Sequence, residues 1–336
     1  MEKHKQLSIL IPAKSEEFLV NTIQDIVRNR EADTEVIAVL DGEYAIPPIP
    51  QMPDVNIIYV NKSVGQRGGT NLAARLSRAK YVAKADAHCA FDKGFDRKMI
   101  EGFEKVGDDV TMVPVMRNLW VFDWKCRRCN WTMYQDTKPA RCGGCNDSRY
   151  LRKKVRWIAK ERPENVSYCF NSEPHFHYFN DYCKRNEYKK DKETGFTQSM
   201  SVQGSFFMCT RENYWKLKIC DEELGNWGNQ GIEVACKTWL SGGRVLTNHN
   251  TWYAHMFRTH DGFAQPWGAS GKDIQKTKNG VWDAVCKNGF PGQKYPVSWL
   301  IDKFYPVGWV DKKTNKFVGW TDEEIKTLKE TEFKPK

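Results

Sequence analysis

The sequence predicts an α/β fold, a mostly parallel sheet flanked by helices, with a small zinc-binding insertion. Short apolar runs that are typical of strands covered on both faces alternate with segments of helical periodicity. Their order over the first 88 residues, strand–helix–strand–strand–helix–strand, favours a parallel sheet with covering helices. Two closely spaced cysteine pairs in the middle of the chain predict the insertion.

Four strands are expected in the first part of the chain, at 7–13, 34–42, 55–61 and 81–88. A helix should follow the first strand, because Leu19, Ile23 and Ile26 recur at helical spacing, and a second helix should occupy 65–80 after its opening glycines. Ligands of open sheets bind beyond the carboxyl ends of the strands. Asp41 and the pair Asp86/His88 fall at two such ends.

The strand-and-helix pattern breaks after residue 123 and returns at 196–217. A helix between glycines is expected at 226–243, and a further strand from residue 244 should end at His255. The last 75 residues show weak periodicity, with a capping box of Thr321 and Glu324 ahead of a terminal helix. We therefore divide the chain into 1–123 and 161–260 as two halves of one domain, 124–160 as the insertion, and 261–336 as a C-terminal extension.

Composition narrows the class of protein. The 336 residues contain no run of about 18 apolar residues, so no membrane span is expected, and "MEKHKQLSILIPAKSEE" reads as a first strand, not a signal peptide. Four of the eleven cysteines form a metal pattern and the other seven have no disulfide spacing. These features favour a reducing, cytoplasmic environment.

The net charge of +10 is concentrated in one segment. Residues 124–162 hold twelve Lys/Arg against three acids, a net of +9. Two interpretations stay open: a solvated surface, or a face that binds a polyanion.

The four insertion cysteines, Cys126, Cys129, Cys142 and Cys145, predict structural Zn²⁺, because two CxxC turns can close a tetrahedral thiolate site without an open position. The module either folds a loop only or faces nucleic acid. Basic residues in and after it favour nucleic acid; they are Arg127, Arg128, Lys153, Lys154 and Arg156. The aromatic residues Trp131, Tyr134 and Tyr150 could stack on bases or form the small core of the module.

A second metal site is expected at the strand ends. Asp86 and His88 can project in one direction from a turn and hold a divalent ion, with His255 as a third ligand from a later strand. Such an ion would neutralise a departing diphosphate.

Several ordered segments resemble glycosyltransferases of the GT-A (Rossmann-like) fold, family 2-like, and among these the polypeptide N-acetylgalactosaminyltransferases. They are "SILIPAKSE", "VIAVLDGEY", "VGQRGGTNLAARLSRAKYVAKADAH", "VQGSFFMCTRENYWKL" and "WGNQGIEVACKTWLSGGRV" followed by "WYAHMFR". The last two are similar to the motifs W-G-G-E-N-L-E-I … W-x-C-G-G and G-H-V-F-R. The resemblance covers roughly 7–120 and 196–260. It makes 1–123 the nucleotide-sugar half and 161–260 the acceptor half.

The resemblance implies roles for individual residues. Asp86, His88 and His255 would bind Mn²⁺ or Mg²⁺ and the donor diphosphate, with Arg258 nearby. A UDP-sugar is the implied donor, and its nucleotide would lie among Pro12, Ala13, Glu16, Asp41, Arg67 and Asn71. Gly204 and Trp227 would border sugar and acceptor, and Asn229, Gln230 and Glu233 would supply catalytic polar groups.

Two departures bear on mechanism. Leu40 replaces one member of the family's acidic pair, and Gln230 stands where the relatives have a glutamate. Because an amide cannot accept a proton at neutral pH, an inverting reaction lacks its general base unless Glu233 replaces it. Glu233 is equally consistent with a supporting carboxylate. A retaining reaction tolerates the change better and is favoured.

The acceptor is inferred from charge and compartment. A basic zinc module favours DNA, so the protein would resemble virus-encoded transferases that attach sugars to hydroxylated bases such as 5-hydroxymethylcytosine, with the base flipped out. Two alternatives stay open: a cytoplasmic transferase that builds a polysaccharide, lipid-linked glycan or glycoprotein, and a non-catalytic nucleic-acid-binding protein on a GT-A scaffold.

Overall fold

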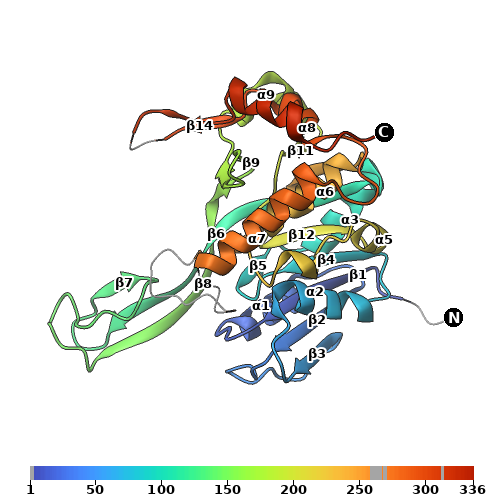
Figure 1. Cartoon of the computed structure of the whole chain (residues 1–336). Helices are drawn as coiled ribbons and strands as arrows, with labels where there is room; N and C mark the ends of the chain where they lie inside the picture. Colours follow the sequence, from blue (N-terminus) through green and yellow to red (C-terminus); the bar gives the residue numbers. More distant parts are fainter. Residues whose placement is uncertain (1–3, 258–266, 268–270, 312–313) are drawn as a thin grey trace.

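The computed structural model describes residues 4–257, 267, 271–311 and 314–336 (Figure 1). Its main sheet has the strand order β11-β13-β6-β12-β4-β1-β2-β3. Strands β1 (Leu7–Ala13), β2 (Thr34–Asp41), β3 (Val55–Val60) and β4 (Tyr81–Ala85) are mutually parallel, as the sequence predicts. The antiparallel strand β12 (Phe206–Thr210) joins β4 to β6 (Val110–Cys126), and β13 (Arg244–His255) runs parallel to β6.

Helices cover both faces of the sheet and create two cores. On one face, Ile9 and Ile11 of β1 pack with α1 (Leu19–Asn29) and α3 (Phe95–Val106). On the other face, Leu10 packs with α2 (Gly65–Leu76), and this core continues through α6 (Gln230–Leu240). Every residue of β1 is buried, which explains why "LSILIPA" is wholly apolar apart from Ser8. The mostly parallel, two-sided α/β arrangement that the sequence predicts is confirmed.

The remaining elements are short or lie toward the C-terminus. The short strands are β5 (Cys89–Phe91), β7 (Thr132–Tyr134), β9 (Tyr168–Phe170), β10 (Phe176–Tyr178), β11 (Phe196–Gln198), β14 (Gly308–Val310) and β15 (Phe317–Gly319). The other helices are α4 (Asn186–Glu193), α5 (Arg211–Lys216), α7 (Gly271–Trp282), α8 (Val297–Phe304) and α9 (Asp322–Thr331). The C-terminal segment packs on the main domain through α8 against α6, and α9 begins at the predicted capping box of Thr321 and Glu324. No helix in the described ranges is long and apolar enough to cross a membrane.

The insertion is a long two-stranded arm, which projects from the body of the molecule in Figure 1. Strand β6 continues past the sheet to Cys126, and β8 (Leu151–Asn165) returns antiparallel to it. The base of the arm is fixed to α1, because Phe122 stacks on Phe18 at 5.9 Å and the Trp157 indole donates to Asp25 at 2.9 Å. The structure thus extends the arm on both sides of the expected boundaries at 124 and 160.

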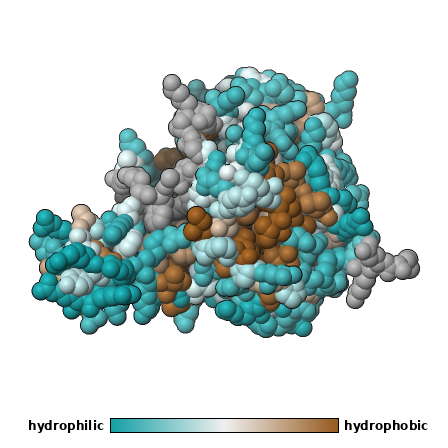
Figure 2. Space-filling view, turned by 90° about the horizontal axis from the view of Figure 1, so that it is seen from below, coloured by the Kyte–Doolittle hydropathy of each residue, from teal (hydrophilic) through white to brown (hydrophobic). Residues whose placement is uncertain are grey.

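Strand β3 forms one edge of the sheet and is only partly covered. Ile57 and Tyr59 of β3 are exposed, as is Ile46 in the loop before it. Figure 2, seen from below, shows hydrophobic residues gathered on the face where β3 lies. Ile58 and Val60 of β3 are half-buried against the core, whereas every residue of β1 is buried, so β3 is covered on one face only.

Candidate active site

Three potential metal ligands meet at the carboxyl edge of the sheet. Strand β4 ends at Ala85, and the turn that follows carries Asp86 and His88. The next strand, β5, pairs antiparallel with β13 so that Cys89 lies opposite His255, which brings the two histidines together. The turn is fixed by two backbone bonds, from Asp86 N–H to the Ser205 carbonyl at 2.8 Å and from Met256 N–H to the His88 carbonyl at 3.1 Å.

The geometry of this cluster suits one divalent cation. The ligand atoms of Asp86, His88 and His255 all lie within 4.8 Å of one another. His88 Nε2 is 3.1 Å from His255 Nε2, which is 3.3 Å from Asp86 Oδ2. Both imidazoles are buried, whereas the Asp86 side chain is 23 % exposed. An ion among them would therefore be held from the protein side and stay open toward solvent and substrate.

Burial and neighbouring charges keep His255 and Asp86 in the protonation states that bind metals. Burial lowers the pKa of His255 to about 4, with a further contribution from neighbouring His88, so the imidazole is neutral at pH 7. Burial alone would raise the pKa of Asp86, but the charge of Lys84 and the hydrogen bond from His255 outweigh it and hold that pKa well below its usual range. Neutral imidazole and ionised carboxylate are the forms that coordinate a cation.

Two residues support the cluster from behind. Glu16, which the resemblance places beside the nucleotide, has its Oε2 3.1 Å from His88 Nδ1. A carboxylate behind a metal-binding histidine fixes the ring and its tautomer. Lys84 is completely buried on β4; its Nζ contacts Asp86 Oδ1 and donates to the Gly204 carbonyl at 2.8 Å. Lys84 is not among the site residues expected from the sequence, although its two-residue spacing from Asp86 on an otherwise apolar strand is a usable signal.

A pocket of about 420 Å³ adjoins the cluster. Its lining includes Asp86, Gln66 and Phe176. It also includes Gly204 and Trp227, which the resemblance places at sugar and acceptor, and Asn229 and Gln230, for which it implies catalytic roles. The Gln230 side chain is nearly buried, and its Nε2 lies 2.9 Å from Cys220 Sγ. Its Oε1 is buried without a hydrogen-bond partner. Buried acceptors normally have a donor partner, so a bound molecule or a water that donates to Gln230 would complete this site.

The expected nucleotide residues divide into rim and scaffold. Pro12 and Ala13 end β1 and are buried. The Asp41 carboxylate accepts from Val64 N–H at 2.7 Å, Gly65 N–H at 3.0 Å and the Trp267 indole at 2.6 Å. Asp41 therefore shapes the start of α2 at the rim of the site, where an acidic group also complements the helix dipole.

Arg67, Asn71 and Glu233 lie in the scaffold beneath the pocket. The Arg67 guanidinium bonds Glu233 at 2.8 Å and donates to the carbonyls of Gly225 and Gly228. Asn71 donates to the Cys220 carbonyl at 2.9 Å and to Glu222. Glu233 is fully buried, and its other oxygen accepts from Lys237 at 2.9 Å. Of the two interpretations left open for Glu233, this placement favours the supporting carboxylate, because both of its oxygens are engaged inside the protein. Arg258 lies outside the described residues.

The four insertion cysteines converge at the tip of the arm. Cys129 and Cys142 Sγ are 3.4 Å apart, Cys126 and Cys145 Sγ are 3.7 Å apart, and all four sulfurs lie within 4.8 Å of one another. Tetrahedral Zn–S bonds of about 2.3 Å separate the sulfurs by about 3.8 Å, so this set fits Zn²⁺. Among the described residues, this cluster and the Asp86 cluster are the two groups that could hold a metal.

Removing the zinc ligands is expected to unfold the tip of the arm and leave the main domain folded. The tip has its own small core of Cys126, Cys142 and Leu151, with Trp131 packed against it. A Cys129→Ser/Cys142→Ser variant should lose one equivalent of zinc by elemental analysis, because a broken tetrahedral site loses most of its affinity. The main thermal transition should move by less than about 3 °C, since the tip shares no core with the sheet. A variant with unchanged zinc content would contradict the assignment.

Of the five basic residues expected to bind nucleic acid, three are exposed on the arm and two pack against other side chains. Arg127, Arg128 and Lys154 are exposed on the arm. Lys153 pairs with Glu17 of the main domain and lies 4.6 Å above the Phe122 ring, while Arg156 stacks on Trp120 at 4.7 Å. Trp131 belongs to the core of the tip, whereas Tyr134 and Tyr150 are exposed, so the aromatic residues divide between the two open interpretations.

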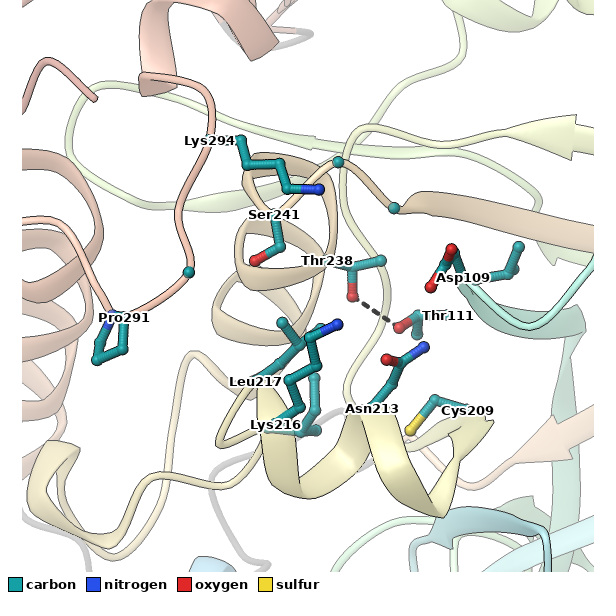
Figure 3. Close-up of a pocket in the computed structure, with 15 residues that line it drawn as sticks. Asp109, Thr111, Cys209, Asn213, Lys216, Leu217, Thr238, Ser241, Pro291 and Lys294 are labelled. Carbon is teal, nitrogen blue, oxygen red and sulfur yellow. Dashed lines mark hydrogen bonds between the residues drawn. The ribbon is translucent and has the colours of Figure 1, made fainter. Parts of the chain in front are cut away.

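A second cavity lies at the other end of the strands, away from the metal-ligand cluster. It has a volume of about 220 Å³ and is lined near the start of β6 and the end of α6, by Thr111, Thr238, Ser241 and Lys294 among others (Figure 3). Thr111 and Thr238 close its floor with a hydrogen bond of 2.7 Å. Since β6 runs from this cavity toward the edge where Asn118 pairs with His255, the cavity is remote from the metal-ligand cluster.

An open α/β sheet, a cation-ligand cluster at its carboxyl edge and an adjoining pocket define the class of GT-A glycosyltransferases. Residues 8–217, more than half of the chain, match the family described as glycosyl transferase family 2. The chain therefore belongs to glycosyl transferase family 2.

Relatives of known name agree with this assignment. A Drosophila melanogaster protein named as a polypeptide N-acetylgalactosaminyltransferase is 31 % identical over 196 residues, 58 % of this chain and 28 % of that protein. A Caenorhabditis elegans protein named as an N-acetylgalactosaminyltransferase is 24 % identical over 93 residues, 28 % of this chain and 15 % of that protein. The solved structure of GalNAc-T7, crystallised with UDP, GalNAc and Mn²⁺, superposes with a TM-score of 0.58 at 14 % identity, over 85 % of this chain and 49 % of that one. The chain thus spans half or less of the length of these relatives.

Proposed function

We propose that this protein transfers a sugar from a nucleoside diphosphate donor, UDP-sugar, to a hydroxyl acceptor. The observation that carries the proposal is the convergence of Asp86, His88 and His255 beside a pocket that Gln230, with its unpaired buried Oε1, helps to line. The GalNAc-T7 structure, which shares this fold, holds UDP and Mn²⁺. Mn²⁺ or Mg²⁺ held by the three ligands would neutralise the charge that develops on the leaving diphosphate.

The residues around the pocket divide the remaining work. Gln230 Oε1 accepts a hydrogen bond from the donor sugar, and Trp227 forms an apolar wall of the same pocket. Glu16 holds the His88 ring in place through its Nδ1. Arg67 and Glu233 hold the loop that carries Trp227 and Asn229, through the Gly225 and Gly228 carbonyls.

We propose retention of configuration at the sugar. Of the described residues that line the pocket, Asp86 is the only carboxylate, and it belongs to the metal-ligand cluster. Gln230 cannot accept a proton, and Glu233 is occupied by Arg67 and Lys237. Since the described lining of the pocket offers no free general base, an oxygen of the leaving diphosphate takes the acceptor proton on the face that the donor leaves, while the bond from the sugar to that diphosphate breaks and the bond to the acceptor oxygen forms.

Gln230→Met is expected to lower kcat/KM for sugar transfer by about 10- to 100-fold, because a lost hydrogen bond to a buried group costs about 1–3 kcal/mol. The affinity for UDP should stay unchanged, since UDP lacks the transferred sugar that is proposed to contact Gln230. Steady-state kinetics and calorimetric titration with UDP measure the two quantities. An equal loss of affinity for UDP would show that Gln230 acts on the nucleotide or on the fold.

For the acceptor, we propose a hydroxymethylated base in DNA. The arm leaves the sheet at the edge that holds the metal ligands, because Asn118 of β6 pairs with His255. Leu119 and Phe122 at the base of the arm share a small core with Ala254 and Met256, the two residues that flank His255. Arginines and lysines give the arm segment 124–162 a net charge of +9, which suits a phosphate backbone. A DNA strand held by the arm would lie next to the pocket, and a flipped base could enter it.

The experiment is to incubate the protein with Mn²⁺, a panel of UDP-sugars and DNA that contains 5-hydroxymethylcytosine. The DNA is then digested, and the masses of its nucleosides are measured by mass spectrometry. A sugar mass added to the modified base supports both donor and acceptor. Release of free sugar without DNA modification supports sugar transfer and directs the search to glycan or protein acceptors. If no nucleotide sugar turns over, a non-catalytic nucleic-acid-binding protein becomes the better explanation.

Removing the arm tests the acceptor separately. A variant with Gly-Ser in place of residues 127–150 keeps the β6–β8 hairpin and removes the zinc module with part of its charge. It should bind DNA at least tenfold more weakly and with a smaller salt dependence. Unchanged DNA binding would count against DNA as the acceptor, whereas hydrolysis of the donor should persist.

A further inference from the structure

Lys84 is a fully buried lysine directly beside the metal-ligand cluster. It lies on β4 two residues before Asp86, which is in the turn directly after the strand, and the two side chains meet. Its Nζ contacts Asp86 Oδ1 and donates to the Gly204 carbonyl at 2.8 Å. The other carboxylate oxygen, Oδ2, faces His255 Nε2 at 3.3 Å. An ammonium and a metal ion would therefore share the two oxygens of one carboxylate.

Asp86 and Lys84 form an ion pair before any metal binds. Asp86 contributes one negative charge and Lys84 one positive charge, and the His255 imidazole is neutral. Glu16 adds a negative charge, but behind the His88 ring. A divalent cation on Oδ2 would thus meet a carboxylate that a neighbouring ammonium has already neutralised. Within a buried site, repulsion between such close cations is weakly screened.

We propose that Lys84 keeps the affinity of this cluster for a divalent cation low until a nucleoside diphosphate binds, so that cation and donor are held together or not at all. The inference rests on the proposed function and deepens it. The diphosphate supplies the negative charge that the cluster lacks, and Lys84 attracts it. Because Lys84 also holds the Gly204 carbonyl, which lies in the wall of the sugar pocket, the same side chain links the cation ligand to that pocket.

The proposal predicts effects of opposite sign when the charge of Lys84 is removed. Lys84→Met should bind Mn²⁺ alone at least tenfold more tightly than the wild type, because the repulsion outweighs the loss of one orienting contact. In the absence of metal, the same variant should bind UDP several-fold more weakly, because an attraction is lost. General destabilisation of the fold would lower the affinity for both ligands, so it cannot produce tighter Mn²⁺ binding together with weaker UDP binding.

The test is titration of Mn²⁺, followed by electron paramagnetic resonance of the free ion, and titration of UDP in the presence of a chelator. The proteins are the wild type, Lys84→Met, Lys84→Gln and the control Lys237→Met. Lys237 is equally buried but pairs with Glu233 and Asp221 away from the cluster, so its variant should leave both affinities unchanged. Lys84→Gln keeps a hydrogen-bond donor without the charge and should follow Lys84→Met.

Two results would overturn the proposal. One is an Mn²⁺ affinity of both Lys84 variants that equals or falls below that of the wild type. The other is a wild type whose affinity for Mn²⁺ is the same with and without saturating UDP. The expected result is an affinity for Mn²⁺ at least tenfold higher with UDP. This measurement needs only the wild type, so it remains possible if both variants fail to fold. His88→Ala tests the metal site independently of Lys84. If this variant loses Mn²⁺ binding in the presence of UDP, the three-ligand metal site is correct even where the Lys84 proposal fails. If it binds Mn²⁺ as the wild type does, the proposed function is refuted.

Discussion

Replacing His88 by alanine is expected to lower sugar transfer about a thousandfold while the protein stays folded. His88 supplies one of three ligand atoms, and with two left the cation would be held weakly and off position. A cation at a leaving diphosphate stabilises the transition state by several kcal/mol, and each 1.36 kcal/mol is a factor of ten in rate. Release of UDP from the donor, followed with saturating Mn²⁺, measures the loss.

Two comparisons separate metal binding from general damage. His249 lies on the same strand as His255 but bonds Thr197 at 2.9 Å in another part of the structure, so His249→Ala should retain most of the activity. Glu16→Gln leaves the three ligands in place and weakens only the support of the His88 ring, for which a 10- to 100-fold loss is expected. If His88→Ala retained more than a tenth of wild-type activity, the cation would have no place in the reaction.

The ligand cluster could be predicted from the sequence because its positions follow from local patterns. Strand ends are visible where an apolar run stops, and β4 and β13 end at Ala85 and His255, next to the predicted ligands. Parallel strands bring their carboxyl ends to one edge, so residues 169 positions apart were expected to meet, and they do.

The supporting residues could not be predicted in the same way. Glu16 reaches His88 across 72 residues, through a loop whose path depends on how α1 packs. Arg67 and Glu233 both sit in family-like motifs that favour an exposed polar role, yet tertiary packing closes them into a buried pair separated by 166 residues. Patterning gives the face of an element but not which polar groups of two distant elements satisfy each other.

The arm shows the same division. The cysteine spacing predicts its metal site, because a CxxC turn sets the sulfur geometry locally. Its length and position could not be predicted, since they depend on contacts between distant residues, such as Trp157 with Asp25 and Lys153 with Glu17. In β8 the exposed Val155 and Ile158 interrupt the polar pattern, so periodicity gave no clear strand.

Glu233→Ala is expected to lower the free energy of unfolding by about 3–5 kcal/mol, the usual effect of removing one partner from a buried ion pair. Arg67 and Lys237 each bond one oxygen of the Glu233 carboxylate. The change would leave both cations buried without this partner. Arg67 also holds the Gly225 and Gly228 carbonyls, so the loop before α6 should loosen with it. Urea denaturation followed by circular dichroism measures the stability, and hydrogen exchange at residues 225–230 reports the loop.

The double variant Arg67→Met/Glu233→Met decides whether Glu233 acts through the fold or through chemistry. If its role is to neutralise Arg67, replacing Arg67 and Glu233 together by apolar groups should recover part of the lost stability, because no uncompensated guanidinium remains and Lys237 keeps Asp221 at 3.7 Å. Activity of the double variant, assayed well below its melting temperature, should then exceed that of Glu233→Ala. A general base would behave differently: Glu233→Ala would keep its stability, lose activity by several orders of magnitude, and gain nothing from the second substitution. The burial of Glu233 and the engagement of both its oxygens favour the first result.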